Sequence, residues 1–558
     1  MLSYRIENLS RRGLLKGVAA GSGLVLAARF LPAGSAWADE PKVGAAGMPH
    51  GTVNDPRVFV SIASDGTVSI VCHRAEMGQG VRTGIPLIVA EELEADWQQV
   101  EVVQATGNEE RYGNQDTDGS RSTRHFMKPM REVGAAARMM LEAAAAKRWG
   151  VDVKEVQADM HQVVHKASGK KLGYGELAVE AAAMPVPPVE KLTLKRPEKF
   201  RYIGKGAPII DGFDIVTGQA QYSIDVRLPG MKYAVIARPP VHGGKLRGFD
   251  AAAAMKVPGV EKVMEIPGTP PPAKFNPQGG VAVIAANTWA AIKGREALKL
   301  DWDDGPNASH DSAKYKAEMS ATAAKPGKSV RNRGDVDQAL AGAAKKVEAE
   351  YYIPHHAHAT MEPPSATALF EGGKCEVWTG VQSPQAARDD TAKMLKLKPE
   401  DVTVYTTLLG GGFGRKSKPD FAIEAAIIAQ AMPGVPIRVH CTRIGTIITT
   451  RSRSSGSKRA STPAARRWLG ATAAWRRRCS RSSSPIPATK ARSRWGWASS
   501  TIRSTSPISA ARRARPRRAC ASVGSARSRT CRTPSRCNRW PARWRMPPAR
   551  TPRTISSR

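Results

Sequence analysis

The feature that most constrains the fold of this chain is an abrupt change of composition near residue 444. Residues 445–558 contain 29 lysines and arginines and no aspartate or glutamate. The whole chain has 85 basic and 49 acidic residues, so residues 1–444 have 85 − 29 = 56 basic and 49 acidic residues, a net charge of +7. The first 444 residues therefore have the charge balance of an ordinary globular protein, and the excess positive charge belongs to the tail.

The selection of residues within this tail is also unusual. It contains six tryptophans but no phenylalanine or tyrosine, and only two of its 29 basic residues are lysine. Codons rich in G and C encode arginine, alanine, proline, glycine and tryptophan, so this selection is typical of GC-rich DNA read in a wrong frame. No sustained apolar periodicity offsets the entropy lost on ordering. We therefore expect residues 444–558 to be an out-of-frame, disordered basic tail. The alternative is a natural basic tail.

Residues 1–38 are typical of a twin-arginine export signal. Arg11 and Arg12 are followed by an apolar run at 18–31 and by Ala36-Trp37-Ala38, a small-x-small cleavage pattern. The apolar run is shorter than the roughly 20 residues that a membrane-spanning helix needs. We therefore expect delivery to the periplasm as a folded protein, with a bulky prosthetic group already inserted. The alternative is a basic N-terminal helix that is retained.

Hydrophobic periodicity predicts an α/β unit after this signal. Alternating β-branched residues predict strands at 58–62 and 68–71, joined as a hairpin by Asp65-Gly66. Apolar spacing predicts the other elements of the unit. These are a strand at 100–103 and helices at 81–95 and 130–149.

A proline-rich stretch at 184–200 predicts a linker. Beyond it we expect a second unit from 203 to 302 and a third from about 347 to 443. The residues between these two units, 305–345, are polar and mostly helical in pattern. The expected fold class is therefore α/β (α+β) with several domains.

Residues 409–416 have the sequence Leu-Gly-Gly-Gly-Phe-Gly-Arg-Lys and lie between a predicted strand at 402–405 and a predicted helix at 421–432. Consecutive glycines let the backbone approach a flat ligand and direct several N–H groups at one anion. The segment lacks the Gly-x-x-x-x-Gly-Lys-Ser/Thr pattern, so it does not predict a P-loop. Alone, this glycine loop would fit many nucleotide-binding sites.

Other motifs make the glycine loop more specific. In chain order they are Thr217–Asp225, Leu228–Met231, His358 with Met361–Pro363, Gln382–Pro384 and the glycine loop. This succession resembles the molybdopterin-binding subunits of the xanthine oxidase family. The resemblance implies an α/β hammerhead domain at 200–303 and the N-terminal part of a molybdopterin-binding domain at 330–443.

Two further loops, Glu76–Gly80 and Gly119–Thr123, resemble loops that bind the pterin dinucleotide near the C-terminus of most relatives. Their early position, together with the export signal, resembles the family branch that contains the isoquinoline 1-oxidoreductase beta subunit, and it makes 50–183 a permuted molybdopterin-binding segment. We expect the Gln79 amide beside a polar ring and the Arg121 guanidinium on a phosphate. The predicted cofactor-binding residues are Gly78, Gln79, Gly80, Ser120, Arg121, Ser122, Gly411, Gly412, Phe413 and Gly414.

The resemblance also implies a chemistry. Intact members hydroxylate an aldehyde carbon or a carbon next to nitrogen in a small-molecule substrate, with oxygen from water. The implied cofactor is molybdopterin with molybdenum, in its cytosine dinucleotide form. No Cys-x-x-Cys pair is present, so iron–sulfur clusters would reside on a small partner subunit and pass electrons to an acceptor such as a cytochrome. The base glutamate of the family would fall after residue 443, where this chain has no glutamate. We therefore name no catalytic residue and expect an incomplete, inactive polypeptide.

Several alternatives remain at this stage. His355, His356 and His358 invite a metal site, but no third cluster of ligands is evident, and we expect no protein-ligated metal. We interpret Glu362 as a cavity-wall carboxylate and Lys416 as a surface or phosphate-binding charge. The basic tail with its tryptophans would also suit a nucleic-acid-binding protein, although the export signal argues against a nucleic-acid partner. A cofactor-free structural paralogue is the third alternative.

Overall fold

The computed structural model describes residues 48, 50–270, 273, 275–329, 332–355, 357–441, 453–462 and 465–475. The predicted export signal and the chain after residue 475 lie outside the described residues. Within the described part, no helix combines the length and the apolar character that crossing a membrane requires.

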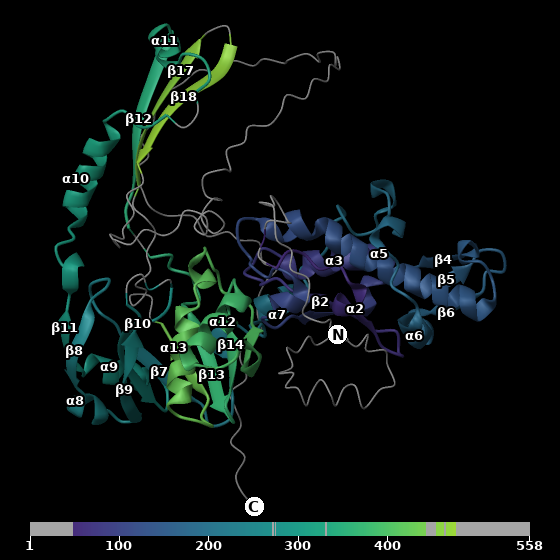
Figure 1. The fold of residues 1–558 in the computed structure, drawn as a ribbon, viewed down its shortest axis with the longest axis horizontal. Coiled ribbons are helices and arrows are strands. Elements are labelled where there is room, and N and C mark those ends of the chain that lie inside the picture. Colours follow the sequence, from purple (N-terminus) through teal and green to yellow (C-terminus); the bar gives the residue numbers. More distant parts are fainter. Residues whose placement is uncertain are drawn as a thin grey trace, which may run out of the picture. The chain divides into compact units, whose positions relative to one another are not determined.

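The first unit contains a small sheet covered by two helices (Figure 1). Strand β1 pairs antiparallel with β2, and β2 pairs parallel with β3. Helices α3 and α5 pack together beside this sheet. The bounds are α2 Pro56–Phe59, β1 Val60–Ile62, β2 Val68–Cys72, α3 Val81–Leu93, β3 Val100–Gln104, α4 Glu109–Tyr112 and α5 Arg121–Trp149. The predicted hairpin, third strand and helices are thus confirmed, but α5 begins earlier than expected, at Arg121.

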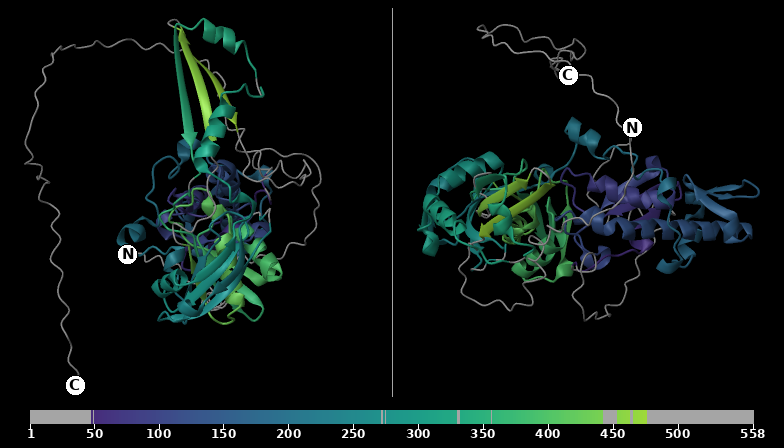
Figure 2. Two further views of the ribbon diagram at one scale, coloured as in Figure 1. Left: turned by 90° about the vertical axis from the view of Figure 1, so that its left-hand side faces the viewer. Right: turned by 90° about the horizontal axis from the view of Figure 1, so that it is seen from above.

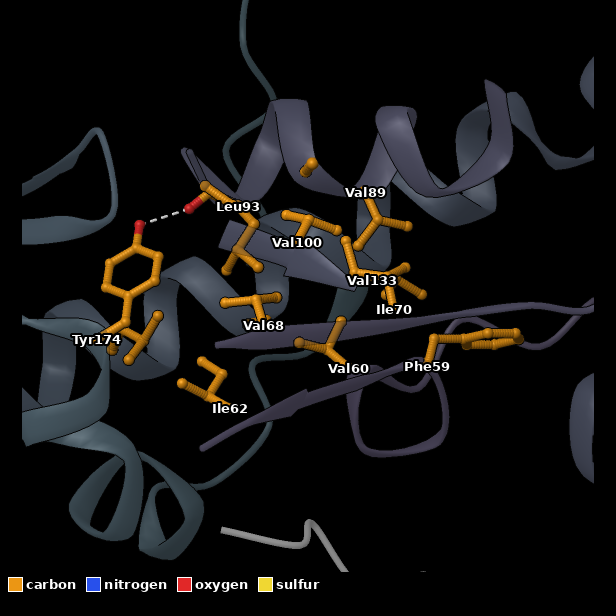
Figure 3. Packing of buried hydrophobic residues seen from close by; sticks show 14 of the residues in the cluster. Phe59, Val60, Ile62, Val68, Ile70, Val89, Leu93, Val100, Val133 and Tyr174 are labelled. Atoms are coloured by element: carbon orange, nitrogen blue, oxygen red, sulfur yellow. Dashed lines mark hydrogen bonds between the residues drawn. The ribbon is translucent and has the colours of Figure 1, made fainter. Parts of the chain in front are cut away.

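A second small sheet extends this unit. Its strands are β4 Val156–Asp159, β5 Gln162–His165 and β6 Lys171–Gly173, followed by α6 Tyr174–Ala183. The hydroxyl of Tyr174 donates to the carbonyl of Leu93 across the core at 2.6 Å (Figure 3). Val89 and Val133, one from each of the two main helices, lie above Ile70 in the same cluster (Figure 3). The close approach of these helices needs Gly134, whose missing side chain would meet the carbonyl oxygen of Val89.

Two buried glutamates of α3 hold the predicted linker, 184–200, and the three residues that follow it. The carboxylate of Glu91 accepts hydrogen bonds from the backbone amides of Arg201, Tyr202 and Ile203. Burial alone would raise the pKa of Glu91, but these bonds and a side-chain bond from Lys195 hold the pKa below its ordinary value. The carboxylate of the neighbouring Glu92 accepts from the backbone amide of Lys195 at 3.0 Å. The linker is therefore held against the first unit by hydrogen bonds to α3.

A seven-stranded mixed sheet follows, in the order β15-β14-β13-β16-β7-β10-β9. Helices α12 and α13 pack on one face of its β13–β16 part. The bounds are β7 Lys232–Ala237, β9 Val260–Gly268, β10 Gln278–Ala285, β13 Ser365–Glu371, β14 Lys374–Thr379, α12 Pro384–Leu395, β15 Val402–Thr406, α13 Asp420–Gln430 and β16 Ile437–His440. This sheet joins strands of the second and third predicted units, which therefore share one layer.

Smaller elements surround this sheet. Strands β8 and β11 form a two-stranded ribbon, and helices α8 and α9 contact β9 and β10. Helices α10 and α11 confirm the expected helical character before the third unit. The bounds are α7 Gly212–Thr217, β8 Lys245–Asp250, α8 Ala252–Met255, α9 Thr288–Glu296, β11 Lys299–Asp303, α10 Ser312–Ala323 and α11 Val336–Ala341.

The start of the basic tail contains two strands. Strands β17 (Arg453–Thr462) and β18 (Ala465–Trp475) form a hairpin, and β17 pairs antiparallel with β12 (Lys345–Ile353). Figures 1 and 2 show the three strands side by side. These two strands, 453–462 and 465–475, are the only parts of the predicted tail that the structure describes. Hydrophobic periodicity in a sequence indicates which side chains are buried in a core. Strand pairing uses backbone N–H and C=O groups, which every non-proline residue carries, so a strand pair can form without such periodicity.

Candidate functional site

Two glycine-containing loops that are far apart in the sequence lie against each other. The first is the β2–α3 loop, residues 73–80, and the second is the glycine loop, residues 409–416. The amide of Leu409 donates to the carbonyl of Glu76 at 2.9 Å. A Cβ atom at Gly412 would lie 2.8 Å from the sulfur of Met77, closer than real Cβ contacts allow. A side chain at 412 would therefore displace Met77 or Gln382 where the two loops meet.

The carboxylate of Glu76 organises the β2–α3 loop from within. One oxygen accepts from the amides of Gly78 and Gly80, at 2.8 and 2.9 Å, and the other accepts from the amide of Arg82 at 2.9 Å. Oriented amides of this kind form an anion-binding concavity, and here the anion is the chain's own side chain. Two of the predicted cofactor-binding amides, those of Gly78 and Gly80, are therefore already occupied.

Gln79 also bonds within its own loop. Its side-chain oxygen accepts from the amide of Met77 at 2.7 Å, and its side-chain nitrogen donates to the carbonyl of Ala75 at 3.0 Å. Both ends of the amide thus brace the turn. The contact of this amide with a polar ring stays a prediction. In the structure, the Gln79 side chain stabilises the turn of its own loop.

Ser120, Arg121 and Ser122 lie where α5 begins. Ser120 has a left-handed backbone (φ +55°) and precedes the helix. The Arg121 Nε atom donates to Asp118 at 2.8 Å, and a second guanidinium nitrogen lies 3.5 Å from Asp116. A phosphate contact by Arg121 would therefore compete with two carboxylates of the same loop. The N-terminal end of this long helix still offers the favourable end of its dipole to an anion.

The glycine loop presents backbone groups that the protein does not use. Among the described residues, no acceptor lies within hydrogen-bonding distance of the amides of Gly411, Gly412 and Phe413. Gly411 and Gly414 have φ values of +91° and +85°, and Phe413 has the left-handed value of +52° that non-glycine residues seldom adopt. The Phe413 side chain is 67 % exposed. The amides of Gly411, Gly412 and Phe413 are thus unused donors, whereas the amide of Gly414 donates to Gln382.

The structure places two charged residues near this loop inside the protein. Lys416 is fully buried, and its ammonium nitrogen lies 2.5 Å from a carboxylate oxygen of Glu362. Glu362 also accepts from the Ser223 hydroxyl at 2.6 Å and from the Gly410 amide at 2.9 Å. The prediction that Lys416 is a surface charge is therefore wrong. Glu362 bridges Ser223 and the glycine loop, and its interpretation as a cavity-wall carboxylate stays a prediction. Burial lowers the pKa of Lys416 despite the opposing attraction of Glu362.

A second buried ion pair fixes the other side of the loop. The guanidinium of Arg415 pairs with both carboxylate oxygens of Asp420, at 2.7 and 2.8 Å. Asp420 is the first residue of α13, where a carboxylate also complements the helix dipole. Arg415 and Lys416 are neighbours in the sequence but are held by different partners. These two ion pairs set the end of the glycine loop in a fixed orientation.

Gln382 is the residue that joins the two halves of the site, and the sequence did not single it out as a site residue. Its side-chain nitrogen donates to the carbonyl of Thr117 at 2.8 Å, and its backbone carbonyl accepts from the Thr117 amide at 2.8 Å. Its side-chain oxygen accepts from the amide of Gly414 at 3.0 Å. One glutamine thus connects the loop before α5 to the glycine loop.

Arg74 is a second residue that the sequence did not reveal. It is fully buried, lies 4.2 Å above the ring of Phe126 and donates to the side chain of Asn114 and the carbonyl of Asp116. Its Nε and one Nη atom have no hydrogen-bond partner among the described residues. Burial lowers the pKa of Arg74 to about 10. The only signal in the sequence was its position within the β2–α3 loop, two residues before Glu76.

The histidine cluster gives no metal centre in the described part of the chain. His356 lies outside the described residues, and the ring of His355 stacks on Tyr315 at 5.5 Å. No group of three or more histidine, cysteine, aspartate or glutamate side chains with metal-binding geometry occurs among the described residues.

Comparisons with known proteins identify the segments that meet here. Two matches to models described as a molybdopterin cofactor-binding domain cover residues 37–211 and 321–466. The first contains the β2–α3 loop and the start of α5, and the second contains the glycine loop. The second match ends at residue 466, soon after the position near Arg443 where the family resemblance is predicted to stop.

Three relatives show how much of a longer protein is represented. The beta subunit of isoquinoline 1-oxidoreductase from Brevundimonas diminuta is 32 % identical over 428 residues, covering 68 % of this chain and 53 % of that protein. A membrane-bound aldehyde dehydrogenase (pyrroloquinoline-quinone) of Gluconacetobacter polyoxogenes is 30 % identical, with coverages of 71 % and 51 %. A nicotinate dehydrogenase chain of Pseudomonas putida is 29 % identical, with coverages of 69 % and 32 %. The chain thus spans about half the length of the first two.

Proposed function

This chain carries molybdopterin cofactor-binding domains and is homologous to molybdenum-binding subunits of the xanthine oxidase family, and from that premise we propose that its function is to hold molybdopterin in an oxidoreductase. The observation that carries the proposal is the meeting of the β2–α3 loop with the glycine loop, since each belongs to a different matched segment. Neither loop alone would define a site.

The residues present fit this cofactor at the glycine loop. The amides of Gly411, Gly412 and Phe413 donate to no described group, and the Phe413 ring is exposed. The side chains of Met77 and Gln382 lie against Gly412 and would border a flat ligand there. Arg121 and the start of α5 would serve an anionic group, such as a phosphate. When bound, molybdopterin supplies a molybdenum centre that exchanges electrons with a substrate. The protein's part is to bind, orient and enclose.

The substrate, the form of the cofactor and the electron-transfer partners are also part of our proposal. We propose that the substrate is an N-heteroaromatic (isoquinoline-like) molecule or an aldehyde, since the names of relatives include isoquinoline, nicotinate and aldehyde. The cytosine dinucleotide form of the cofactor, a small iron–sulfur subunit and a cytochrome-like acceptor belong to this proposal. One relative is named for pyrroloquinoline quinone, so chemical analysis of the cofactor must separate a pterin from a quinone.

We also propose that residues after about 443 are read out of frame and that the chain as written is inactive. The composition of 445–558 supports this, while the match to residue 466 and strands β17 and β18 argue for some retained structure. Translating the underlying DNA in its other two frames tests the point directly. A continuous frame with acidic residues soon after Arg443 and a later glutamate is expected, and early stop codons in both other frames would rule out the frame change.

Metal analysis tests the cofactor assignment. The full chain and a frame-restored version would each be purified from a host that makes molybdopterin, together with any iron–sulfur partner. We expect about one molybdenum and one pterin per restored chain, and little of either in the chain as written. Stoichiometric molybdenum in the chain as written would overturn the proposed inactivity. Its absence from the restored chain, or a quinone in its place, would overturn the molybdopterin assignment.

A further inference from the structure

The seven-stranded sheet has a pocket on the face opposite α12 and α13. On strands β14 and β15, Val377 and Val404 are fully buried in the core beneath these helices. Because successive side chains of a strand alternate between faces, Glu376, Trp378 and Tyr405 point to the other side. There they line a pocket of about 300 Å³. The pocket therefore belongs to the sheet face that the two helices leave uncovered.

The walls of this pocket are aromatic and apolar. Trp378 and Tyr405 stack with ring centroids 5.2 Å apart and an angle of 17° between their planes. Leu369, Pro229 and Pro436 complete the walls. Trp378 is only 8 % exposed, so its ring is held in place. Flat, rigid walls of this kind suit a flat ring.

One carboxylate gives the pocket its charge. The Tyr405 hydroxyl donates to one oxygen of Glu376 at 2.7 Å, which orients the carboxylate along the aromatic pair. Within the described part of the chain, no lysine, arginine or histidine lies within ion-pair distance of Glu376. Arg438, on the same face of β16, donates instead to the carbonyls of Ile224 and Val226. The carboxylate therefore makes the pocket unfavourable for anions and favourable for cations.

We propose that this pocket binds a planar aromatic cation of one or two fused rings. The ring would lie against the open side of the stacked Trp378–Tyr405 pair, where a cation gains from the ring quadrupoles, while the positive charge approaches Glu376. None of the pocket's residues belongs to the β2–α3 loop or to the glycine loop. The site therefore goes beyond the proposed cofactor function and does not depend on bound molybdopterin.

Three probes of one shape and different charge test the proposal. Equilibrium dialysis of the full chain would compare 1-methylquinolinium, neutral 1-methylnaphthalene and anionic 1-naphthoate. We expect the cation to bind best and the anion to bind worst. Glu376→Gln should weaken binding of the cation about tenfold and leave the neutral probe unchanged. Trp378→Phe keeps a ring but should weaken cation binding about threefold.

A matched control distinguishes the effect of the Glu376 charge inside the pocket from the effect of negative charge elsewhere on the same sheet face. Glu371 lies on the same sheet face, is exposed and does not line the pocket. Glu371→Gln removes the same charge and should change the dissociation constant of the cation less than about twofold. Circular dichroism and thermal melting establish that each variant is folded. Equal affinity for all three probes, or equal loss of cation binding in Glu371→Gln and Glu376→Gln, would overturn the proposal. So would no measurable binding of the cation at millimolar concentration.

Discussion

The ammonium of Lys416 and the carboxylate of Glu362 form a buried ion pair, 2.5 Å apart, directly behind the glycine loop. Glu362 carries three further hydrogen bonds, from the Ser223 hydroxyl and from the amides of Ile224 and Gly410. The pair thus ties the end of the glycine loop to two other segments of the chain. Loss of this ion pair should therefore move the glycine loop and lower the free energy of unfolding of the protein.

Lys416→Met should lower the free energy of unfolding by about 3–5 kcal/mol, because it leaves the carboxylate of Glu362 buried without its cation. Adding Glu362→Gln to this variant should recover part of the loss, since the amide keeps acceptors and donors without the charge. Denaturant unfolding of the two single variants and the double variant measures the coupling. Strictly additive effects would show that the pair does not act as a unit.

Gly412→Ala should destabilise the protein by about 1–3 kcal/mol through overpacking. The new Cβ atom would lie 2.5 Å from the side-chain oxygen of Gln382. Gly414→Ala is the matched control, because nothing lies within 4 Å of its Cβ position and only its φ of +85° is strained, at about 1 kcal/mol. Hydrogen exchange at the Leu409 amide should quicken only in Gly412→Ala. Equal exchange in both variants would contradict a role for Gly412 in loop contact.

Glu109 should make stability depend on pH. Burial raises the pKa of Glu109 to about 7, against an ordinary value of 4.5. The folded state therefore holds the proton more tightly, so this group's contribution is fully present below about pH 4.5 and disappears as the pH rises through about 7. In Glu109→Gln the free energy of unfolding should fall less between about pH 5 and 8 than in the parent. Glu110→Gln, an exposed neighbour on α4, should keep the parent slope; identical slopes in all three proteins would refute the assignment.

Export should depend on the paired arginines of the N-terminus. Changing Arg11 and Arg12 together to lysine should retain the precursor in the cytoplasm, because the translocase reads the paired guanidinium groups. Arg5→Lys makes the same chemical change outside the pair and should be exported normally. Cell fractionation with an antibody against the chain measures the outcome, and unchanged periplasmic delivery of the double variant would exclude twin-arginine export.

Local patterns predicted the secondary structure near the site well. The strands at 58–62 and 68–71 appear as β1 and β2, and the strand and helix flanking the glycine loop appear as β15 and α13. These elements depend on alternation or helical spacing within a few residues, which the sequence displays directly. The first predicted strand differs only in that residues 56–59 form a short helical turn, with Pro56 at its first position.

Contacts between residues far apart in the chain could not be predicted from the sequence, for a physical reason. The burial of Lys416 depends on Glu362, which is 54 residues away, and no local pattern records that pairing. Gln382 and Arg74 matter through partners on other loops. The shared seven-stranded sheet places β16 beside β7, which the chain order does not reveal. The pairing of β17 with β12 joins segments about a hundred residues apart through backbone groups, which composition does not reveal.

The bond between Gln382 and Thr117 spans 265 positions of the chain. The first unit has its own core of β1–β3, α3 and α5 and depends little on later residues for that core. It can become ordered while the ribosome is still adding the second half of the polypeptide, whereas closing a loop of several hundred residues is entropically slow. The two halves of the site thus mature at different times during synthesis. A ligand that needs both halves can be enclosed only after residue 416 has left the ribosome.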